Sequence, residues 1–391
     1  MSVFTSFDVE LLLISMLRSR LLEKGGGLLQ GDNVDFACSL EEAFPALTVD
    51  DKLDVYKHLC EMLGAVADDC SNVLSQSVRT VCSNAYAQWE NGPAVLFFRT
   101  SGSTGVPVVC EQSLELLEQE ALFLATLVKD CSRVVCVVPQ HHIYGFLFTV
   151  LLPTVLKADR LIVPPYPGQS FINLLQDRDV VIAFPMFWKG QSELQLECDK
   201  DVVGITSTGP CPAEVIQKLI SKGFSTILEV YGSSETGGVG YRRAPDTPYE
   251  LFPYWEMEND LLQRTGGAGN IICALSFPDN VRWDSPRLFM PLRRKDNAVQ
   301  VAGRNVYPDR VKQEILSHPD VVECAVRLMR PEEGSRLKAF IVPSEKCEDW
   351  NLFKKELQAW CRTRCSVAEL PKKITIGSDL PRNSIGKLAD W

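Results

Sequence analysis

Short apolar runs that alternate with amphipathic segments are the feature that most constrains the fold of this chain. The apolar runs cover residues 134–138, 160–163, 180–184, 202–206 and 226–231, and residues 213–222 form one of the amphipathic segments between them. This alternation predicts a parallel sheet covered by helices, because parallel neighbours need a crossover connection. Ligands of such sheets bind beyond the carboxyl ends of the strands. The residues that follow these runs are therefore the first candidates for a site.

The pattern changes after about residue 294. Short strands are predicted at 321–329 and 338–342, and helices at 308–317 and 350–364. These elements predict a small α+β domain of roughly a hundred residues, within the usual size of a domain. We therefore expect a large N-terminal α/β domain, residues 1–294, and a small C-terminal α+β domain, residues 295–391.

A segment rich in glycine, serine and threonine at residues 98–107 is typical of a loop that holds phosphate. Gly102 and Gly105 allow a tight turn that brings backbone N–H groups close to an anion, and the neighbouring hydroxyls add donors. The candidate phosphate-binding residues are Thr100, Ser101, Gly102, Ser103, Thr104 and Gly105. A helix is predicted to follow at 111–127. The segment is not a Walker A loop, because it has no lysine or arginine between Gly102 and Val109. An ordinary turn is the alternative interpretation.

This loop and three later segments resemble, in the same order, the motifs of the adenylate-forming superfamily, which includes acyl-CoA synthetases, aryl-CoA ligases such as 4-coumarate-CoA ligase, and adenylation domains. The later segments are residues 231–238, 293–308 and 380–387. The family loop usually ends in Pro-Lys, whereas this chain has Pro107 followed by Val108. The resemblance spans about residues 95 to 391. It implies a short 4-coumarate-CoA-ligase-like member with an AMP-binding domain, a reduced N-terminal part and a mobile C-terminal lid.

Residues 231–238 resemble the family motif Tyr-Gly-x-Thr/Ser-Glu. The resemblance implies that Tyr231 lies against adenine, that Gly232 and Ser234 lie near the nucleotide, and that Glu235 coordinates the Mg²⁺ that bridges ATP oxygens. Magnesium is a hard cation that prefers carboxylate and phosphate oxygens, which agrees with this role. A glycine-rich connection with a solvated glutamate is the alternative.

The segments at 293–308 and 380–387 resemble the family's hinge and its closing motif. The resemblance implies that Arg294 binds the ribose hydroxyls, that Asp296 lies at the hinge, and that Lys387 enters the active site for the first half-reaction. An ammonium group held in place stabilises the charge that builds up when a carboxylate attacks the α-phosphorus. A basic surface loop and a solvated tail lysine are the alternatives.

Weaker resemblances complete the predicted site. Residues 207–209, that is Ser207, Thr208 and Gly209, resemble the stretch along the adenine, and a turn after a strand is the alternative. His142 resembles a residue that helps to seat the substrate carboxylate, although a histidine is often a satisfied core residue. The usual Thr-Gly-Asp motif that grips the ribose is absent, so Asp284 is the candidate for that role, with Asp279 in reserve.

The resemblance implies an ATP-dependent carboxylic acid:thiol ligase. Such an enzyme forms an acyl adenylate with release of pyrophosphate and then a thioester with coenzyme A or with the phosphopantetheine arm of an acyl carrier protein. Candidate pocket residues Tyr144, Phe146, Phe184 and Phe187 favour a compact aromatic acid, although core packing explains aromatic side chains equally well. The alternatives are a stand-alone adenylation enzyme that needs a partner for thiol transfer, and a catalytically inactive nucleotide-binding relative.

Composition excludes some other classes. A net charge of −10 argues against a nucleic-acid-binding surface. The fourteen cysteines are scattered, and we find no secretory leader pattern, so we expect reduced thiols and a cytoplasmic location. The most apolar stretch, 143–156, contains Pro153 and is too short to cross a bilayer, so we expect it in the core and expect no membrane span.

Overall fold

The computed structural model describes residues 3–25, 35–67, 70–100, 108–164, 171–195, 197–259, 261–266, 269–277, 279–301, 304–330, 332–347, 349–382, 389 and 391. These residues divide into two compact units. The large unit comprises residues 1–99, 109–277 and 282–290, and the small unit comprises 100–108, 278–281 and 291–391. The predicted domain boundary after Arg294 stays a prediction; the strand β14 (Leu288–Arg294) ends at that residue.

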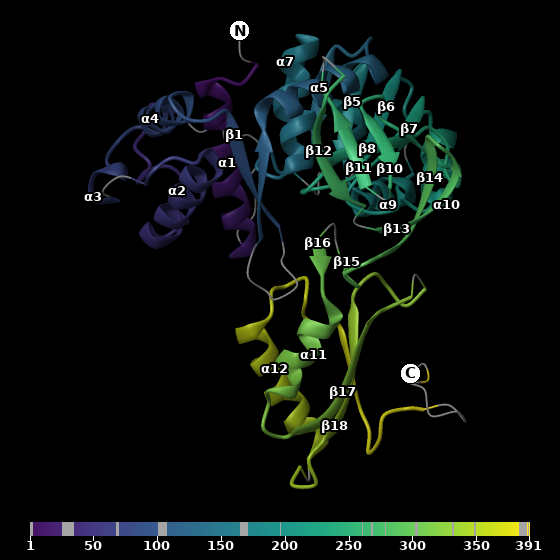
Figure 1. The fold of residues 1–391 in the computed structure, drawn as a ribbon. Helices are drawn as coiled ribbons and strands as arrows, with labels where there is room; N and C mark the ends of the chain where they lie inside the picture. The colour runs from purple at the N-terminus through teal and green to yellow at the C-terminus, as the bar shows by residue number, and fades with distance from the viewer. Residues whose placement is uncertain are drawn as a thin grey trace. The chain divides into compact units, whose positions relative to one another are not determined.

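The large unit begins with helices, which lie together in Figure 1. They are α1 (Ser6–Glu23), α2 (Val49–Leu63), α3 (Cys70–Val73) and α4 (Val78–Glu90). Side-chain caps mark the beginning of α2 and of α4. Thr48 accepts a hydrogen bond from the N–H of Asp51, whose carboxylate accepts one from Thr48 in return, so two of the unpaired donors at the start of α2 are satisfied.

The strands β1 (Val95–Thr100) and β2 (Val108–Ser113) follow and pair with each other, and α5 (Leu114–Leu127) comes next. The prediction of a helix over 111–127 was therefore wrong for its first turn. Glu111, Gln112 and Ser113 belong to β2, and the helix begins only after Ser113, which is its N-cap. Pairing with β1 outweighs the local helix preference of these residues, as tertiary context often does.

The central sheet confirms the α/β prediction. Its parallel strands are β3 (Arg133–Cys136), β4 (Asp159–Ile162), β5 (Asp179–Ala183), β6 (Val202–Thr206) and β7 (Thr226–Ser233). The strands β8 (Gly237–Arg242), β9 (Tyr249–Leu251) and β14 extend it in antiparallel fashion, and β13 (Asp279–Ser285) is next to β14. The spatial order is β13-β14-β9-β8-β7-β6-β5-β3-β4. The edge of the sheet where β6 and β7 end is thus also the edge where β8 begins.

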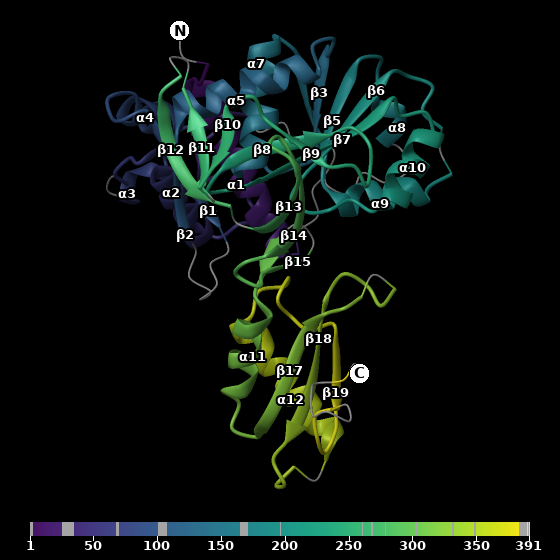
Figure 2. The same cartoon turned by 45° about the vertical axis from the view of Figure 1, so that its right-hand side comes forward.

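Helices cover the parallel strands, as Figure 2 shows. They are α6 (Ile143–Gly145), the π-helical turn η1 (Phe146–Leu151), α7 (Leu152–Leu156), α8 (Phe171–Leu174), α9 (Pro185–Glu193) and α10 (Ala213–Ser221). Trp188 of α9 and Leu219 of α10 pack with Val181 of β5 and Ile227 of β7 in one buried cluster. Residues 146–153 are buried, so the expected core position of this apolar stretch is confirmed. Among the described helices, none is long and apolar enough to span a bilayer.

A second, smaller sheet of the large unit is an antiparallel meander of β10 (Trp255–Glu258), β11 (Leu261–Thr265) and β12 (Ile271–Ser276). Arg264 of β11 and Trp255 of β10 are directly paired in register. Both side chains are fully buried, which places a charged guanidinium inside the protein.

The small unit confirms the predicted α+β fold. It contains the hairpin of β15 (Val299–Val301) and β16 (Arg304–Val306), followed by α11 (Pro308–Leu316), β17 (Val321–Leu328), β18 (Leu337–Pro343), α12 (Trp350–Arg364) and β19 (Lys373–Ile376). The strand β18 pairs antiparallel with β17 and parallel with β19. Val311, Ile315, Ile341 and Leu357 share its buried core, so this unit buries an apolar cluster of its own.

Candidate active site

The turn between β7 and β8 presents Glu235 at the carboxyl end of the parallel sheet. The backbone N–H of Ser233 donates to Oγ1 of Thr236 at 3.2 Å, and the N–H of Thr236 donates to Oγ of Ser233 at 3.3 Å. Only glycine fits at position 232, because a Cβ there would lie 2.3 Å from the carbonyl oxygen of Gly237. Glu235 itself is exposed. A closed, tightly packed turn thus holds a carboxylate toward solvent where ligands of such sheets bind.

Tyr231 enters this turn from β7 with its ring held by other aromatic rings. It stacks on Phe277 with ring centroids 5.6 Å apart and an interplanar angle of 20°, and it meets Phe289 edge-on at 5.4 Å. The side chain is half-buried. Such packing leaves one well-defined orientation for a flat aromatic surface, which is what stacking against a nucleobase requires.

The loop after β6 lies next to this turn, because β6 and β7 are parallel neighbours. Ser207, Thr208 and Gly209 are all half-buried. Thr208 has φ +74°, a left-handed conformation that is strained for a β-branched residue. Its Oγ1 is buried and makes no hydrogen bond to any described residue. Strained backbone and a buried polar atom without a partner both occur at ligand sites.

A buried carboxylate fastens the end of this loop to the sheet. Glu229 of β7 accepts a hydrogen bond from the backbone N–H of Cys211 at 3.3 Å and forms an ion pair with Arg242 of β8 at 2.5 Å. Both partners are almost fully buried. The loop at 207–209 and the turn of Glu235 are therefore tied to the same pair of strands.

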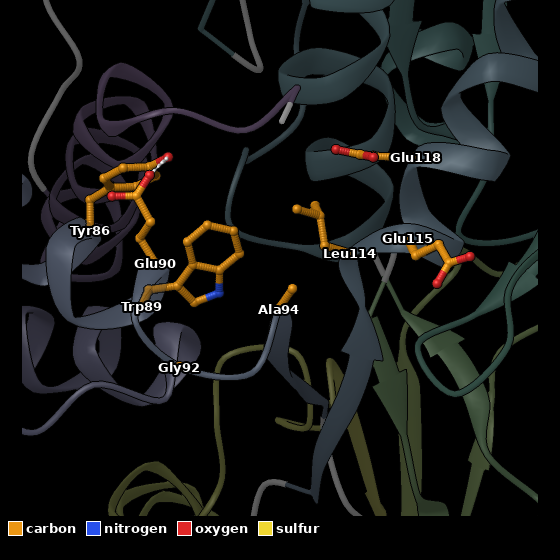
Figure 3. Close-up of a pocket in the computed structure, with 8 residues that line it drawn as sticks. All are labelled: Tyr86, Trp89, Glu90, Gly92, Ala94, Leu114, Glu115 and Glu118. Carbon is orange, nitrogen blue, oxygen red and sulfur yellow. Dashed lines mark hydrogen bonds between the residues drawn. The ribbon is translucent and has the colours of Figure 1, made fainter. Parts of the chain in front are cut away.

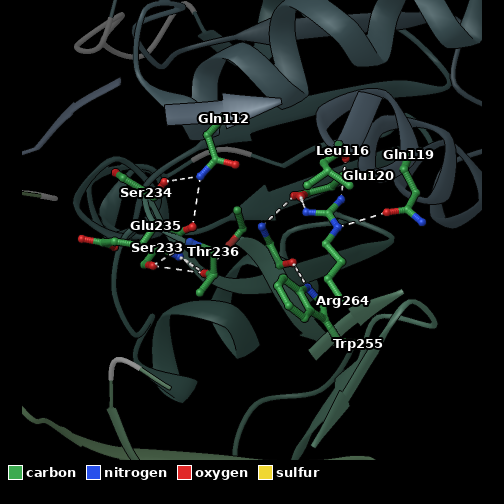
Figure 4. Close-up of polar contacts among 12 residues, drawn as sticks. Gln112, Leu116, Gln119, Glu120, Ser233, Ser234, Glu235, Thr236, Trp255 and Arg264 are labelled. Carbon is green, nitrogen blue, oxygen red and sulfur yellow. Dashed lines mark hydrogen bonds and ion pairs between the residues drawn. The ribbon is translucent and has the colours of Figure 1, made fainter. Parts of the chain in front are cut away.

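The resemblance did not predict a buried network beneath β8, which Figure 4 shows. Glu120 of α5 accepts a hydrogen bond at 2.8 Å from the N–H of Gly238, three residues after Glu235. Arg264 lies 3.9 Å from the other carboxylate oxygen of Glu120 and donates to Oε1 of Gln119 at 3.0 Å. The guanidinium also lies over the ring of Tyr254, 4.4 Å from its centroid. These partners lie far apart in the sequence, so no local sequence pattern predicts their contacts.

Burial raises the pKa of Glu120 to about 7, and the charge of Arg264 opposes the rise only in part. The folded-state pKa lies above the ordinary value of 4.5, so the protonated form of Glu120 is the one that favours folding. Its contribution to the free energy of unfolding is therefore fully present below about pH 4.5. That contribution is lost as pH rises to about 7, and the loss is about 3 kcal/mol. Glu120→Gln stays neutral, so we expect the stability of the wild type relative to this variant to fall between pH 4.5 and pH 7. Urea unfolding of both proteins at pH 5 and pH 8 measures this, and parallel pH profiles would contradict it.

His142 is exposed and is the N-cap of α6, and its neighbour His141 supports it. The two rings lie 4.5 Å apart. The buried His141 has its Nδ1 2.8 Å from Oγ of Ser15, and that oxygen accepts a hydrogen bond from the N–H of Gln140. The hydrogen bond between Oγ of Ser15 and Nδ1 of His141 holds the ring of His141 in place.

The aromatic residues suggested for a substrate pocket are largely core. Phe146 and Phe187 are almost fully buried, and Phe184 is packed against the same cluster as Phe187. Oη of Tyr144 lies 2.9 Å from the carbonyl oxygen of Ala183 and 3.1 Å from that of Ile205. Core packing is therefore the better interpretation of Tyr144, Phe146 and Phe187.

In the small unit, Arg294 and Asp296 form a two-bond ion pair. Nε of Arg294 donates to Oδ1 of Asp296 at 2.8 Å, and Nη2 donates to Oδ2 at 2.7 Å. Hydrogen bonding to Arg294 lowers the pKa of Asp296. The charge of Asp279 is one of the causes that raise the pKa of Arg294, so this reserve candidate lies near the arginine. Asp284, in contrast, is exposed and pairs with Arg282 of its own strand at 2.9 Å.

Other predicted residues lie outside the described part of the chain. These are Ser101, Gly102, Ser103, Thr104, Gly105 and Lys387. Thr100 ends β1, and Val108, where the family has lysine, begins β2. The predicted roles of all these residues stay predictions.

A pocket of about 460 Å³ lies elsewhere in the large unit, between α4 and α5 (Figure 3). Trp89 and Leu114 supply apolar lining, and Glu90, Glu115 and Glu118 supply carboxylates. It contains none of the predicted site residues, so we do not assign it to the active site.

Comparison with known proteins agrees with the geometry. The model of the AMP-binding enzyme family matches residues 39–260, and that of the AMP-binding enzyme C-terminal domain matches 311–387. A 4-coumarate–CoA ligase of Halorhodospira halophila is 34% identical over 293 residues, covering 75% of this chain and 74% of that protein. A 4-coumarate–CoA ligase of Cereibacter sphaeroides is 34% identical over 305 residues, covering 77% and 72%.

Solved structures share the fold at low identity. An o-succinylbenzoate CoA synthetase from Bacillus subtilis has a TM-score of 0.61 at 18% identity, covering 78% of this chain and 72% of that one. The amide bond synthetase McbA from Marinactinospora thermotolerans has a TM-score of 0.61 at 13% identity, covering 96% and 92%.

The helix-covered sheet and the small α+β unit together give the fold that is shared with these solved structures. The chain belongs to the AMP-binding enzyme family. Its predicted class, an ATP-dependent acid–thiol ligase that acts through an adenylate, is thereby confirmed.

Proposed function

We propose that this enzyme joins a compact aromatic acid of the 4-coumarate type to coenzyme A. The observation that carries the proposal is the similarity to 4-coumarate–CoA ligases over about three quarters of the chain. The exposed Glu235 on a closed turn at the carboxyl edge of the sheet supports it, because adenylate formation needs a carboxylate at that place to hold a cation beside the triphosphate.

The nucleotide contacts are proposed from the geometry within each unit. The ring of Tyr231 and residues 207–209 receive the adenine, and Oγ1 of Thr208 is a buried polar atom suited to a ligand partner. Residues 100–105, with Gly232 and Ser234, hold the phosphates. Arg294 binds the ribose hydroxyls, and its proximity to Asp279 favours Asp279 over Asp284 as the acidic partner.

The charges of the site residues indicate their roles in adenylate formation. Glu235 would hold Mg²⁺, which neutralises phosphate charge when bound. His142, whose ring lies 4.5 Å from the ring of His141, seats the acid's carboxylate for attack on the α-phosphorus. Lys387 balances the charge that develops there. Rotation of the lid at Asp296 then admits the thiol, and the closed site protects the mixed anhydride from water.

We favour coenzyme A over a carrier protein as the thiol, since both similar ligases named above use coenzyme A by name. Neither the stand-alone adenylation enzyme nor the inactive relative is favoured by this similarity. A cytoplasmic location remains our proposal; the cysteines whose side chains are described are free thiols, as a reducing compartment requires.

Pyrophosphate release from ATP and magnesium, measured across aromatic and aliphatic acids with and without coenzyme A, tests the proposal. We expect release with 4-coumarate and close aromatic analogues at least tenfold faster than with aliphatic acids of the same length, and a thioester product when coenzyme A is present. Faster release with aliphatic acids would contradict the aromatic preference. Adenylate without thioester would point to another acceptor, and no release with any acid would point to an inactive relative.

A further inference from the structure

Gln112 of β2 makes two hydrogen bonds to the turn that carries Glu235. Its side-chain Nε2 donates to the carbonyl oxygen of Ser234 at 2.7 Å and to that of Glu235 at 3.1 Å (Figure 4). The residue is only 6% exposed, although it lies more than a hundred positions before the turn in the sequence. A side-chain amide has two N–H protons, so one Gln112 can serve both carbonyls at once.

These two bonds hold the backbone on both sides of the Cα atom of Glu235. The carbonyl of Ser234 belongs to the peptide plane before the Cα atom of Glu235, and the carbonyl of Glu235 belongs to the peptide plane after it. When both planes are held, the direction in which the Glu235 side chain leaves the backbone is held as well. On the far side of the turn, the N–H of Gly238 is held by Glu120, so the turn is anchored from β2 and from α5.

The negative charge of the Glu235 carboxylate also acts on a side chain of β2. Burial raises the pKa of the Cys110 thiol to about 11, and the charge of Glu235 adds to that rise. Cys110 is two residues before Gln112 on the same strand. The carboxylate and the amide that holds its backbone thus share one local environment.

We propose that Gln112 is a positioning residue that aims Glu235 at magnesium-bound ATP. The inference rests on the proposed function, because it assumes that Glu235 holds the ion. Gln112 touches neither substrate nor metal; it acts through the turn. Its loss leaves two carbonyls of the turn without their donor and lets the turn relax.

The test compares ATP affinity with and without Mg²⁺ by calorimetry. Gln112→Met keeps the length of the side chain and removes both donors. We expect magnesium to strengthen ATP binding about tenfold less in Gln112→Met than in the wild type, which corresponds to about 1.4 kcal/mol. Magnesium-free affinity should change less than twofold. An unchanged magnesium effect, or an equal loss with and without magnesium, would overturn the inference.

Gln88→Met is the matched control. Gln88 of α4 is also an amide that bonds the backbone of another segment, since its Oε1 accepts a hydrogen bond from the N–H of Val66 at 3.0 Å, and it is not one of the residues that hold the turn. We expect magnesium to strengthen ATP binding in this control variant as much as it does in the wild type. Should Gln112→Met not fold, Gln112→Asn keeps the amide and shortens its reach by one methylene, and a wild-type magnesium effect in that variant would equally overturn the inference.

A readout in the two half-reactions separates this inference from the proposed function. In Gln112→Met, pyrophosphate release should fall about tenfold, while thioester formation from a supplied acyl adenylate stays within twofold of the wild type. If the wild type releases no pyrophosphate with any acid, the proposed function fails, and the calorimetric comparison still decides the role of Gln112.

Discussion

Lys387→Ala is expected to lower acid-dependent pyrophosphate release by about 10²- to 10³-fold, the range found when one preorganised electrostatic group is removed from an active site. In the first half-reaction, a carboxylate must approach the α-phosphorus of ATP, and negative charge builds up between two anions. The lysine's ammonium offsets that charge. In the second half-reaction a thiol attacks an adenylate that is already formed, so the same lysine is not required.

Two assays measure the effect. Pyrophosphate release reports adenylation, and thioester formation from a supplied acyl adenylate reports the second step, which should stay within a few-fold of the wild type. Lys372→Ala is a suitable control, because Lys372 is an exposed lysine of the same unit outside the motif. Equal loss in both half-reactions would contradict the rotating-lid assignment of Lys387.

Glu235→Gln should lower magnesium-dependent turnover about a hundredfold and raise the magnesium concentration needed for half-maximal rate. The amide keeps the shape of the side chain and removes the negative charge, so a hard cation loses its preferred ligand while the turn keeps its bonds between Ser233 and Thr236. A hundredfold loss corresponds to about 2.7 kcal/mol of transition-state stabilisation.

Magnesium titrations of both proteins at saturating acid and ATP check this prediction. Glu214→Gln, on the exposed face of α10, controls for the loss of one surface carboxylate. If Glu235→Gln has the magnesium response of the wild type, Glu235 does not hold the ion, and another carboxylate must be sought.

Much of the fold could be predicted from the sequence, because its signals are local. Apolar runs such as 180–184 and 202–206 were predicted as strands within a residue of β5 and β6, since a strand buried on both faces needs a continuous apolar run. The helix α12 begins and ends where its periodicity predicts. The motif at 231–238 likewise carries its glycines and its glutamate in one short segment, and the structure makes it a closed turn.

Contacts between distant segments could not be predicted. The first residues of the segment at 111–127 form a strand because β1 pairs with them, and the aromatic side chains of Tyr144 and Phe187 turned out to be core because the sheet encloses them. A single sequence does not show which distant strand a segment will pair with or which side chains the sheet will enclose.

The sequence by itself therefore determined the class of enzyme, the order of the parallel strands and of the main elements of the small unit, and the residue types available for chemistry. Only the tertiary structure decided which groups hold those residues in place: Gln112 beneath the turn of Glu235, Glu120 on the N–H of Gly238, and Ser15 on the ring of His141. The physical reason is that hydrogen bonds and burial depend on distance in space, and each of these pairs is separated by more than a hundred residues along the chain.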